Sequence, residues 1–211
     1  MSAGSAIIPP HSTVELAEAD ERLGGLGGFF TPRDLHAVGL TPSQLRGLIR
    51  SGMVSREGRG LYRRCDVAPT ENYSLALASA RVPRSIVCLL SALRVHGIGT
   101  QAPAAIWLAI PHKARVPRLP ELRLRIARFT RAAWTFGVVP TEFEGVPAHV
   151  TSPARTIVDC FRFERLVGAE VAQEALRDSL RQRIVTVGEL SRVEEVLPSR
   201  RLRAMLEFQS V

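Results

Sequence analysis

Polar side chains recur along one side of residues 42–51, a segment whose pattern predicts a short amphipathic helix. Arginine forms paired hydrogen bonds with guanine or with phosphate, and short polar groups near the start of a helix can reach base edges. A small residue on the same side would let the backbone approach DNA closely. We therefore expect this helix to bind in a DNA major groove. The residues expected to contact DNA here are Thr41, Ser43, Gln44, Arg46, Gly47 and Arg50.

More basic residues follow directly, in a segment that predicts a β-hairpin. Residues 53–57 and 61–64 have the character of strands, and a glycine–arginine–glycine turn stands between them. A hairpin of this kind, called a wing, can place an arginine in the minor groove or against phosphates. We expect contacts from Arg59 at the tip, from Arg56 on the first strand, and from Arg33 in the preceding helix.

Two helices must hold these side chains in place, and each has its own start and stop signals. Thr31 and Thr41 each stand before a proline, a pair that suits the first residues of a helix. Gly39 and Gly52 follow the two helices, where glycine readily takes the left-handed conformation. The order helix, turn, helix and hairpin within residues 31–64 predicts a winged helix-turn-helix.

Apolar residues on the second helix predict how the two helices pack. Leu45, Leu48 and Ile49 have helical spacing and are expected to contact Leu35 and Val38 of the first helix. The plainer alternative is a helical hairpin and a strand pair with an ordinary solvated basic face. Each feature alone fits that alternative, but the ordered set favours DNA binding.

The charge of the chain also favours a polyanionic partner. Its formal net charge is +8; residues 1–28 hold one arginine and four acids, whereas residues 29–64 hold seven arginines and two acids. Neutralising phosphates releases counterions and supplies most of the non-specific affinity for DNA. Lys113 is the one lysine among 28 basic residues, so Walker-A loops and Schiff-base enzymes are disfavoured.

Cysteine spacing and hydropathy predict a globular protein without a metal centre or a disulfide framework. The three cysteines, Cys65, Cys88 and Cys160, are far apart and form no CxxC pair. We therefore expect no metal and no cofactor, and a reduced, cytoplasmic setting. The start of the chain lacks a signal-peptide pattern, and the most apolar stretch, residues 86–93, is too short to cross a bilayer. No membrane role is expected.

The predicted fold class is α+β, with the winged helix-turn-helix followed by a mixed α+β C-terminal domain. The predicted parts are a tail at residues 1–12, the winged helix-turn-helix domain at 13–64, a linker at 65–72 and the α+β domain at 73–211. Strands are expected at 105–110 and 122–129, with a hairpin at 138–150. Helices are expected at 73–81, 152–161, 168–182, 186–196 and 198–208, and in the later part of 85–95.

A second basic surface is expected around the strand at residues 122–129. Leucine and isoleucine alternate there with arginine, which predicts one apolar face and one guanidinium face. This surface could extend a DNA footprint, meet an acidic protein, or simply be a solvated sheet face. Its residues are Lys113, Arg115, Arg118, Arg123, Arg125 and Arg128.

Catalytic patterns are weak, and we expect no enzyme activity and no catalytic residues. The histidines are scattered, and Asp159 is expected to pair with Arg155 or Arg162 on one helix. A DNA endonuclease needs clustered acids with a nearby lysine, and Glu142 and Glu144 have none. A ligand-sensing C-terminal domain is a further alternative for which the sequence contains no motif.

The two halves together resemble the AbiEi family of antitoxins. In the first half the likeness lies in residues 30–64, FTPRDLHAVGLTPSQLRGLIRSGMVSREGRGLYRR. In the second half it lies in SLALASARVPRSIVCLLSALRVHGI, IWLAIP, SPARTIVDCFRF and EVAQEALRDSLRQR. The order of these segments, which span roughly residues 14–190, is more specific than any one of them.

The resemblance implies a transcriptional autorepressor whose winged helix binds inverted repeats in its own promoter. It also implies a C-terminal domain that counteracts a nucleotidyltransferase toxin encoded next to it, by direct binding or by an indirect route. Inverted repeats are double-stranded DNA sites that a homodimer or two separate monomers can occupy. The DNA-contacting residues named above come from helix and wing geometry and not from the resemblance.

Overall fold

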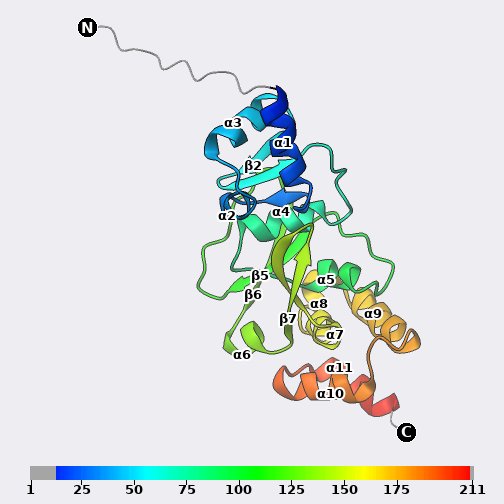
Figure 1. Cartoon of the computed structure of the whole chain (residues 1–211). Helices are drawn as coiled ribbons and strands as arrows, with labels where there is room; N and C mark the ends of the chain where they lie inside the picture. The colour runs from blue at the N-terminus through cyan, green and yellow to red at the C-terminus, as the bar shows by residue number, and fades with distance from the viewer. Residues whose placement is uncertain (1–12, 210–211) are drawn as a thin grey trace. The chain divides into compact units, whose positions relative to one another are not determined.

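The computed structural model of the chain describes residues 13–209 and divides them into two compact units. Unit 1 contains the described residues up to Tyr73 together with Glu144–Val146. Unit 2 contains Ser74–Phe143 and the described residues from Pro147 onward. The N-terminal tail expected at residues 1–12 lies outside the described residues. Figure 1 labels the elements of both units.

Unit 1 has the elements of a winged helix-turn-helix in the expected order. They are α1 (Thr13–Leu23), β1 (Phe29–Phe30), α2 (Pro32–Ala37), α3 (Pro42–Arg50), β2 (Val54–Gly58) and β3 (Leu61–Arg64). The strands form one sheet in the order β1-β3-β2, and both pairings are antiparallel. Helices α2 and α3 are the predicted helical pair, and β2 and β3 form the wing.

A single apolar cluster holds unit 1 together. Leu23 of α1, Leu35 of α2 and Leu48 of α3 are buried in it, together with Phe30 of the small sheet. Val38 and Ile49 pack against the cluster while remaining partly exposed. The apolar residues expected to hold the two helices together therefore all belong to, or pack against, one cluster. Burying such side chains supplies the main stabilisation of a small domain.

Unit 2 is built on one mixed sheet of five strands. Its helices are α4 (Tyr73–Arg81), α5 (Leu89–Val95), α6 (Arg131–Thr135), α7 (Pro153–Arg162), α8 (Glu164–Val167), α9 (Ala169–Arg181), α10 (Val187–Val196) and α11 (Arg200–Gln209). Its strands are β4 (Ile86–Val87), β5 (Ile106–Pro111), β6 (Leu124–Phe129), β7 (Val138–Phe143) and β8 (Val146–Thr151). The strand order is β6-β5-β4-β8-β7. Strand β4 is antiparallel to β5 and parallel to β8, and β5 is parallel to β6.

The main core of unit 2 lies between one face of this sheet and its C-terminal helices. Trp107 of β5 and Phe129 of β6 are buried there against Ile157 of α7 and Leu176 of α9. Helix α7 packs against α5, α9 and α10, so it forms the centre of the helical layer. Figure 1 shows α5, α7 and α9 gathered beside the strands, with α10 and α11 paired at the end of the layer.

Most of the expected elements of unit 2 are present, and the α+β class is confirmed. The strand expected at 122–129 begins at Leu124, because a turn in which the Leu122 N–H donates to the Leu119 carbonyl at 3.0 Å precedes it. The short helices α6 and α8 were not predicted. Four or five residues are too few for a helical hydrophobic pattern to be recognised.

The expected two-faced pattern of β6 is only half right. Arg125 does alternate with the half-buried Leu124 and Ile126. However, its face of the strand continues into Ala127 and Phe129, which are buried in the main core. The exposed Arg125 and the buried Ala127 and Phe129 therefore lie on the same face of the strand, the face that the main core covers further along. Short-range alternation could not reveal this, because the helices that cover Phe129 come much later in the chain.

Candidate nucleic-acid interface

A capping box fixes the start of α3. The Gln44 N–H donates to the Thr41 hydroxyl oxygen at 3.2 Å, and the Thr41 N–H donates to the Gln44 side-chain oxygen at 2.9 Å. These bonds satisfy N–H groups that a helix start otherwise leaves without partners. Gly39 before the cap and Gly52 after the helix have φ of +72° and +79°, as expected for the two stops. The orientation of α3 is thus set at both ends.

The exposed side of α3 presents arginines whose guanidinium groups are free. Arg46 and Arg50 are exposed and are separated by about one turn of helix. Arg33 of α2 and Arg59 of the wing are also exposed. Within the part of the chain that the structure describes, none of these four side chains has a hydrogen bond or an ion pair. All five donors of each guanidinium therefore remain for phosphates or base edges.

Two of the residues expected to contact DNA have other roles in α3. Gly47 is buried, so its expected place on the exposed side of the helix is wrong. Leu45 and Leu48 of the same helix are buried as well, and a residue without a side chain is easily covered next to them. The side-chain oxygen of Gln44 also accepts from the Thr41 hydroxyl at 2.9 Å, so the cap occupies it. Bidentate reading of adenine needs that oxygen as well as the amide nitrogen. Ser43 is half-buried, and Thr41 is exposed.

The wing is a tight hairpin whose tip carries Arg59. Gly58 pairs with Leu61, which leaves Arg59 and a glycine as the turn, and that glycine, Gly60, has φ of +69°. A left-handed residue is characteristic of tight hairpin turns. The register shifts between Arg56 and Gly58, and the Arg56 Nε donates to the Gly58 carbonyl at 3.3 Å. Arg56 remains exposed and thus accessible beside the tip.

Two further arginines of the wing strand bond to other residues of the protein and are not available on the exposed surface. Arg64 is buried and forms an ion pair with Asp66, with Nη2 2.5 Å from Oδ2. Hydrogen bonds from Arg64 hold the pKa of Asp66 below its ordinary value. Arg63 donates to the Val67 carbonyl and lies over the Tyr73 ring, 5.4 Å from its centroid. The net charge of residues 29–64 therefore overstates the charge available to DNA. Asp66, two residues after Arg64 in the sequence, was the signal that Arg64 would be paired.

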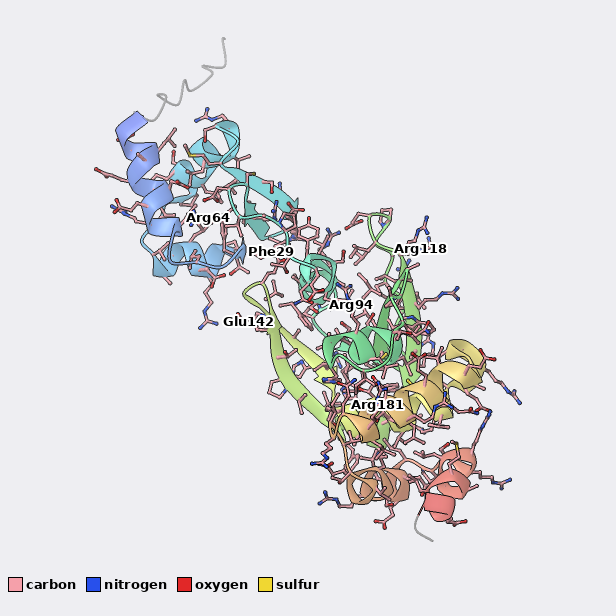
Figure 2. The ribbon with its side chains drawn as sticks, turned by 90° about the vertical axis from the view of Figure 1, so that its right-hand side faces the viewer. Phe29, Arg64, Arg94, Arg118, Glu142 and Arg181 are labelled. Atoms are coloured by element: carbon pink, nitrogen blue, oxygen red, sulfur yellow. The ribbon has the colours of Figure 1, made fainter. Side chains whose placement is uncertain are left out.

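The six residues of the expected second basic surface are all exposed, but they do not lie on one face of the sheet. Arg123 and Arg125 are two residues apart and share one face of the strand. Arg128 is three residues after Arg125, so its side chain points to the opposite side of β6. The Arg128 Nη1 donates to the His112 and Ala114 carbonyls at 2.5 and 3.0 Å, which anchors the loop between β5 and β6. Lys113, Arg115 and Arg118 follow one another along that loop. Figure 2 shows Arg118 on it, beside the strands.

Asp159 lies in the core of unit 2 and not in an accessible site. Its two carboxylate oxygens accept from Arg155 Nε and Arg162 Nη1, each at 2.8 Å. The sequence predicted that Asp159 pairs with Arg155 or with Arg162, and in the structure it pairs with both. With 0% of its side chain exposed, Asp159 has no path to a substrate.

Other chemistry is scarce in the described part of the chain. Residues 13–209 contain no group of three or more metal-binding side chains close enough to hold an ion. The three cysteines are free thiols, with Cys65 exposed and the other two buried. Among the same residues, no helix has the length and apolarity needed to span a bilayer.

Comparisons with known proteins cover both units. A family model described as "Transcriptional regulator, AbiEi antitoxin" matches residues 18–64, and one described as "AbiEi antitoxin C-terminal domain" matches residues 85–208. Among solved structures, the chain is similar to the RV2827C protein from Mycobacterium tuberculosis. The two are 20% identical over 89% of this chain and 72% of that one, with a TM-score of 0.54, which concerns the fold alone. No curated protein matches the chain.

Proposed function

Because the chain belongs to the AbiEi antitoxin family, we propose that it represses its own operon by binding inverted repeats in the promoter and that it counteracts a nucleotidyltransferase toxin. The antitoxin and regulator role follows from the family. The promoter, the toxin and the residues in contact are our proposal. The observation that carries it is the set of free, exposed arginines on α3 and at the wing tip.

In the proposed complex, α3 lies in the major groove. Arg46 and Arg50 supply the donors for guanine edges or phosphates, because their guanidinium groups are exposed and free. Ser43 stands in the first turn of the helix, where N–H groups and short side chains favour phosphate oxygens. The Thr41 hydroxyl donates to the Gln44 side-chain oxygen and so belongs to the cap. Bonded in the cap, Gln44 contributes by holding the helix. We assign no contact to Gly47, since it is buried.

The wing and the start of α2 would contact the DNA backbone on either side of the groove. Arg59 lies at the tip of a tight hairpin and can enter the minor groove or pair with phosphates. Arg56 and Arg33 are exposed and have the charge needed for phosphate contacts. Two copies of the chain would occupy the two halves of an inverted repeat, as a homodimer or as neighbouring monomers.

Operator binding is tested with DNA taken from upstream of the gene. The full-length protein is titrated into a labelled duplex of that region and into a duplex with scrambled repeats, at one salt concentration. A variant that replaces Arg46, Arg50 and Arg59 with alanine should lose the preference for the natural sequence. The matched control replaces Arg165, Arg177 and Arg200, three exposed arginines of unit 2. Equal affinity of the native protein and the α3–wing variant would refute the interface.

The antitoxin part of the proposal is tested in cells. The neighbouring gene is expressed from an inducible promoter, alone and together with the full-length protein. Restored growth on co-expression supports neutralisation, which would take place in the cytoplasm. A neighbouring product that is harmless, or a growth defect that the protein does not relieve, would contradict it. Mixing the two purified proteins then distinguishes direct binding from an indirect route.

A further inference from the structure

Strand β6 leaves one edge of the five-stranded sheet without a partner strand. It is the terminal strand of the sheet, and its one paired neighbour is β5. The Ile106 N–H donates to the Arg123 carbonyl at 2.8 Å, and the His112 N–H donates to the Phe129 carbonyl at 3.0 Å. Because backbone groups alternate in direction along a strand, the groups of Arg123, Arg125, Ala127 and Phe129 face β5.

The residues between them direct their backbone groups away from the sheet. These are Leu124, Ile126 and Arg128. Within the described residues, no backbone or side-chain group bonds to the N–H or carbonyl of any of the three. A row of such groups can pair with an added strand.

The charge beside this edge is strongly positive. Between Lys113 and Arg131 the chain carries seven basic residues, all exposed, and one acid, Glu121. Glu121 lies 3.0 Å from Arg81, so a cation already neutralises it. An occupant of the edge would therefore need negative charge.

The two sides of the edge differ in chemistry. On one side, Arg123 and Arg125 are exposed. On the other side, the loop before β6 forms a hollow of about 440 Å³, and Val116 of that loop is 46% exposed. The hollow is lined by Pro117, Arg118, Leu119, Pro120, Leu122 and Leu124. An extended segment lying here would place alternate side chains on arginine and on apolar surface.

We infer that the outer edge of β6 binds an extended segment of another protein in which acidic and apolar residues alternate. The segment pairs with the outward backbone groups of Leu124, Ile126 and Arg128. Its acids face Arg123 and Arg125, and its apolar side chains enter the hollow. A protein strand explains the apolar hollow and the free strand edge, which a duplex DNA contact would leave unused. Protein interfaces combine an apolar centre with a charged rim, whereas DNA interfaces are more polar.

The probe is a short synthetic peptide that alternates glutamate with valine, titrated into the full-length protein. We expect saturable binding and slower hydrogen exchange at the outward amides of Leu124, Ile126 and Arg128. The same peptide with methylated backbone nitrogens should not bind, because it cannot donate to the strand edge. A duplex DNA of similar charge is tested in parallel.

Exposed arginines elsewhere in unit 2 supply the matched control. Replacing Arg123 and Arg125 with serine should weaken peptide binding about three- to thirtyfold, since it removes two cross-strand charge pairs. Replacing Arg165 and Arg177 with serine should leave it unchanged. The inference fails if the peptide does not saturate up to about 1 mM. It also fails if the methylated peptide binds equally well, or if the DNA and not the peptide protects these amides. No residue of α3 or the wing takes part, so loss of operator binding would leave this site untouched.

Discussion

Arg155 and Asp159 lie one turn apart on α7 with 0% of either side chain exposed, and Arg155 Nε is 2.8 Å from Asp159 Oδ2. Arg155 also donates to the Phe136 carbonyl and, at 3.0 Å, to the Ala133 carbonyl, so it ties α6 to α7. Burial raises the pKa of the Asp159 carboxyl, and its two arginine partners oppose that rise. This buried pair therefore holds α6 against α7.

Removing the acid of this pair should destabilise unit 2. We expect Asp159→Ala to lower the free energy of unfolding by about 3–5 kcal/mol, because the Arg155 charge stays buried without its counter-ion. Urea unfolding followed by circular dichroism measures the change, with Glu170→Ala as an exposed control. A loss below about 1 kcal/mol would contradict the role given to the pair. Replacing Arg155 with Met and Asp159 with Leu together should restore much of the stability, since no charge then remains buried.

The arginines of α3 should control operator affinity. Arg46→Ala or Arg50→Ala is expected to weaken binding to the natural operator by about 1–3 kcal/mol wherever the residue makes a good base contact. Fluorescence anisotropy at fixed salt gives the affinities. Because both side chains are exposed, thermal unfolding should be unchanged in either variant. If operator affinity falls only in parallel with stability, the arginines do not bind DNA directly.

Arg59 of the wing should contribute to DNA affinity through its charge more than through recognition of the base sequence. We expect Arg59→Ala to weaken binding to specific and scrambled duplexes alike, and to lower the slope of log affinity against log salt by about 1. A salt titration on both duplexes measures this. Loss of discrimination between the duplexes with an unchanged slope would instead indicate base reading by Arg59.

Gln44 should matter for the helix cap and not for base discrimination. Gln44→Ala removes an acceptor of the Thr41 N–H and should cost about 1 kcal/mol of stability. Gln44→Glu keeps an acceptor oxygen, so stability should be retained, while the added negative charge weakens DNA binding. Thermal unfolding and operator titration separate the two effects. A changed base preference in Gln44→Ala at unchanged stability would overturn this assignment.

Stability should fall in acid partly through α9. The Gly99 N–H, then Gln182 and Arg181, donate to Asp178 and hold its pKa below its ordinary value. A carboxyl with a lowered folded-state pKa stabilises above its unfolded pKa, and this stabilisation is lost as the pH falls through the folded value. The Asp178→Asn variant should therefore lose less stability than the native protein between about pH 5 and pH 2. Urea unfolding at several pH values tests this, with Glu170→Gln as the control. Identical pH profiles for Asp178→Asn and the native protein would contradict it.

Local signals in the sequence predicted the elements of unit 1 well. The threonine–proline starts and the glycine stops act within a few residues, and the structure has α2, α3 and the wing where they indicate. The pairing of Asp159 was equally local, since both partners lie within one helical turn of it.

Features that depend on distant segments could not be predicted in this way. The inward face of β6 depends on α7 and α9, which come later in the chain. The capping role of Gln44 was visible as a threonine three residues before it, but the same residue type also suits base recognition. Helical spacing alone does not decide between the two.

The arginines along β6 also affect whether this sheet edge can pair with the same edge of a second copy of the chain. Two copies of the chain that met edge to edge would bring Arg123 and Arg125 of one copy against the same residues of the other. Like charges directly opposite one another are destabilising, and charged side chains on an edge strand protect natural sheets from aggregation. Repulsion between these arginines therefore disfavours pairing of two copies through this strand.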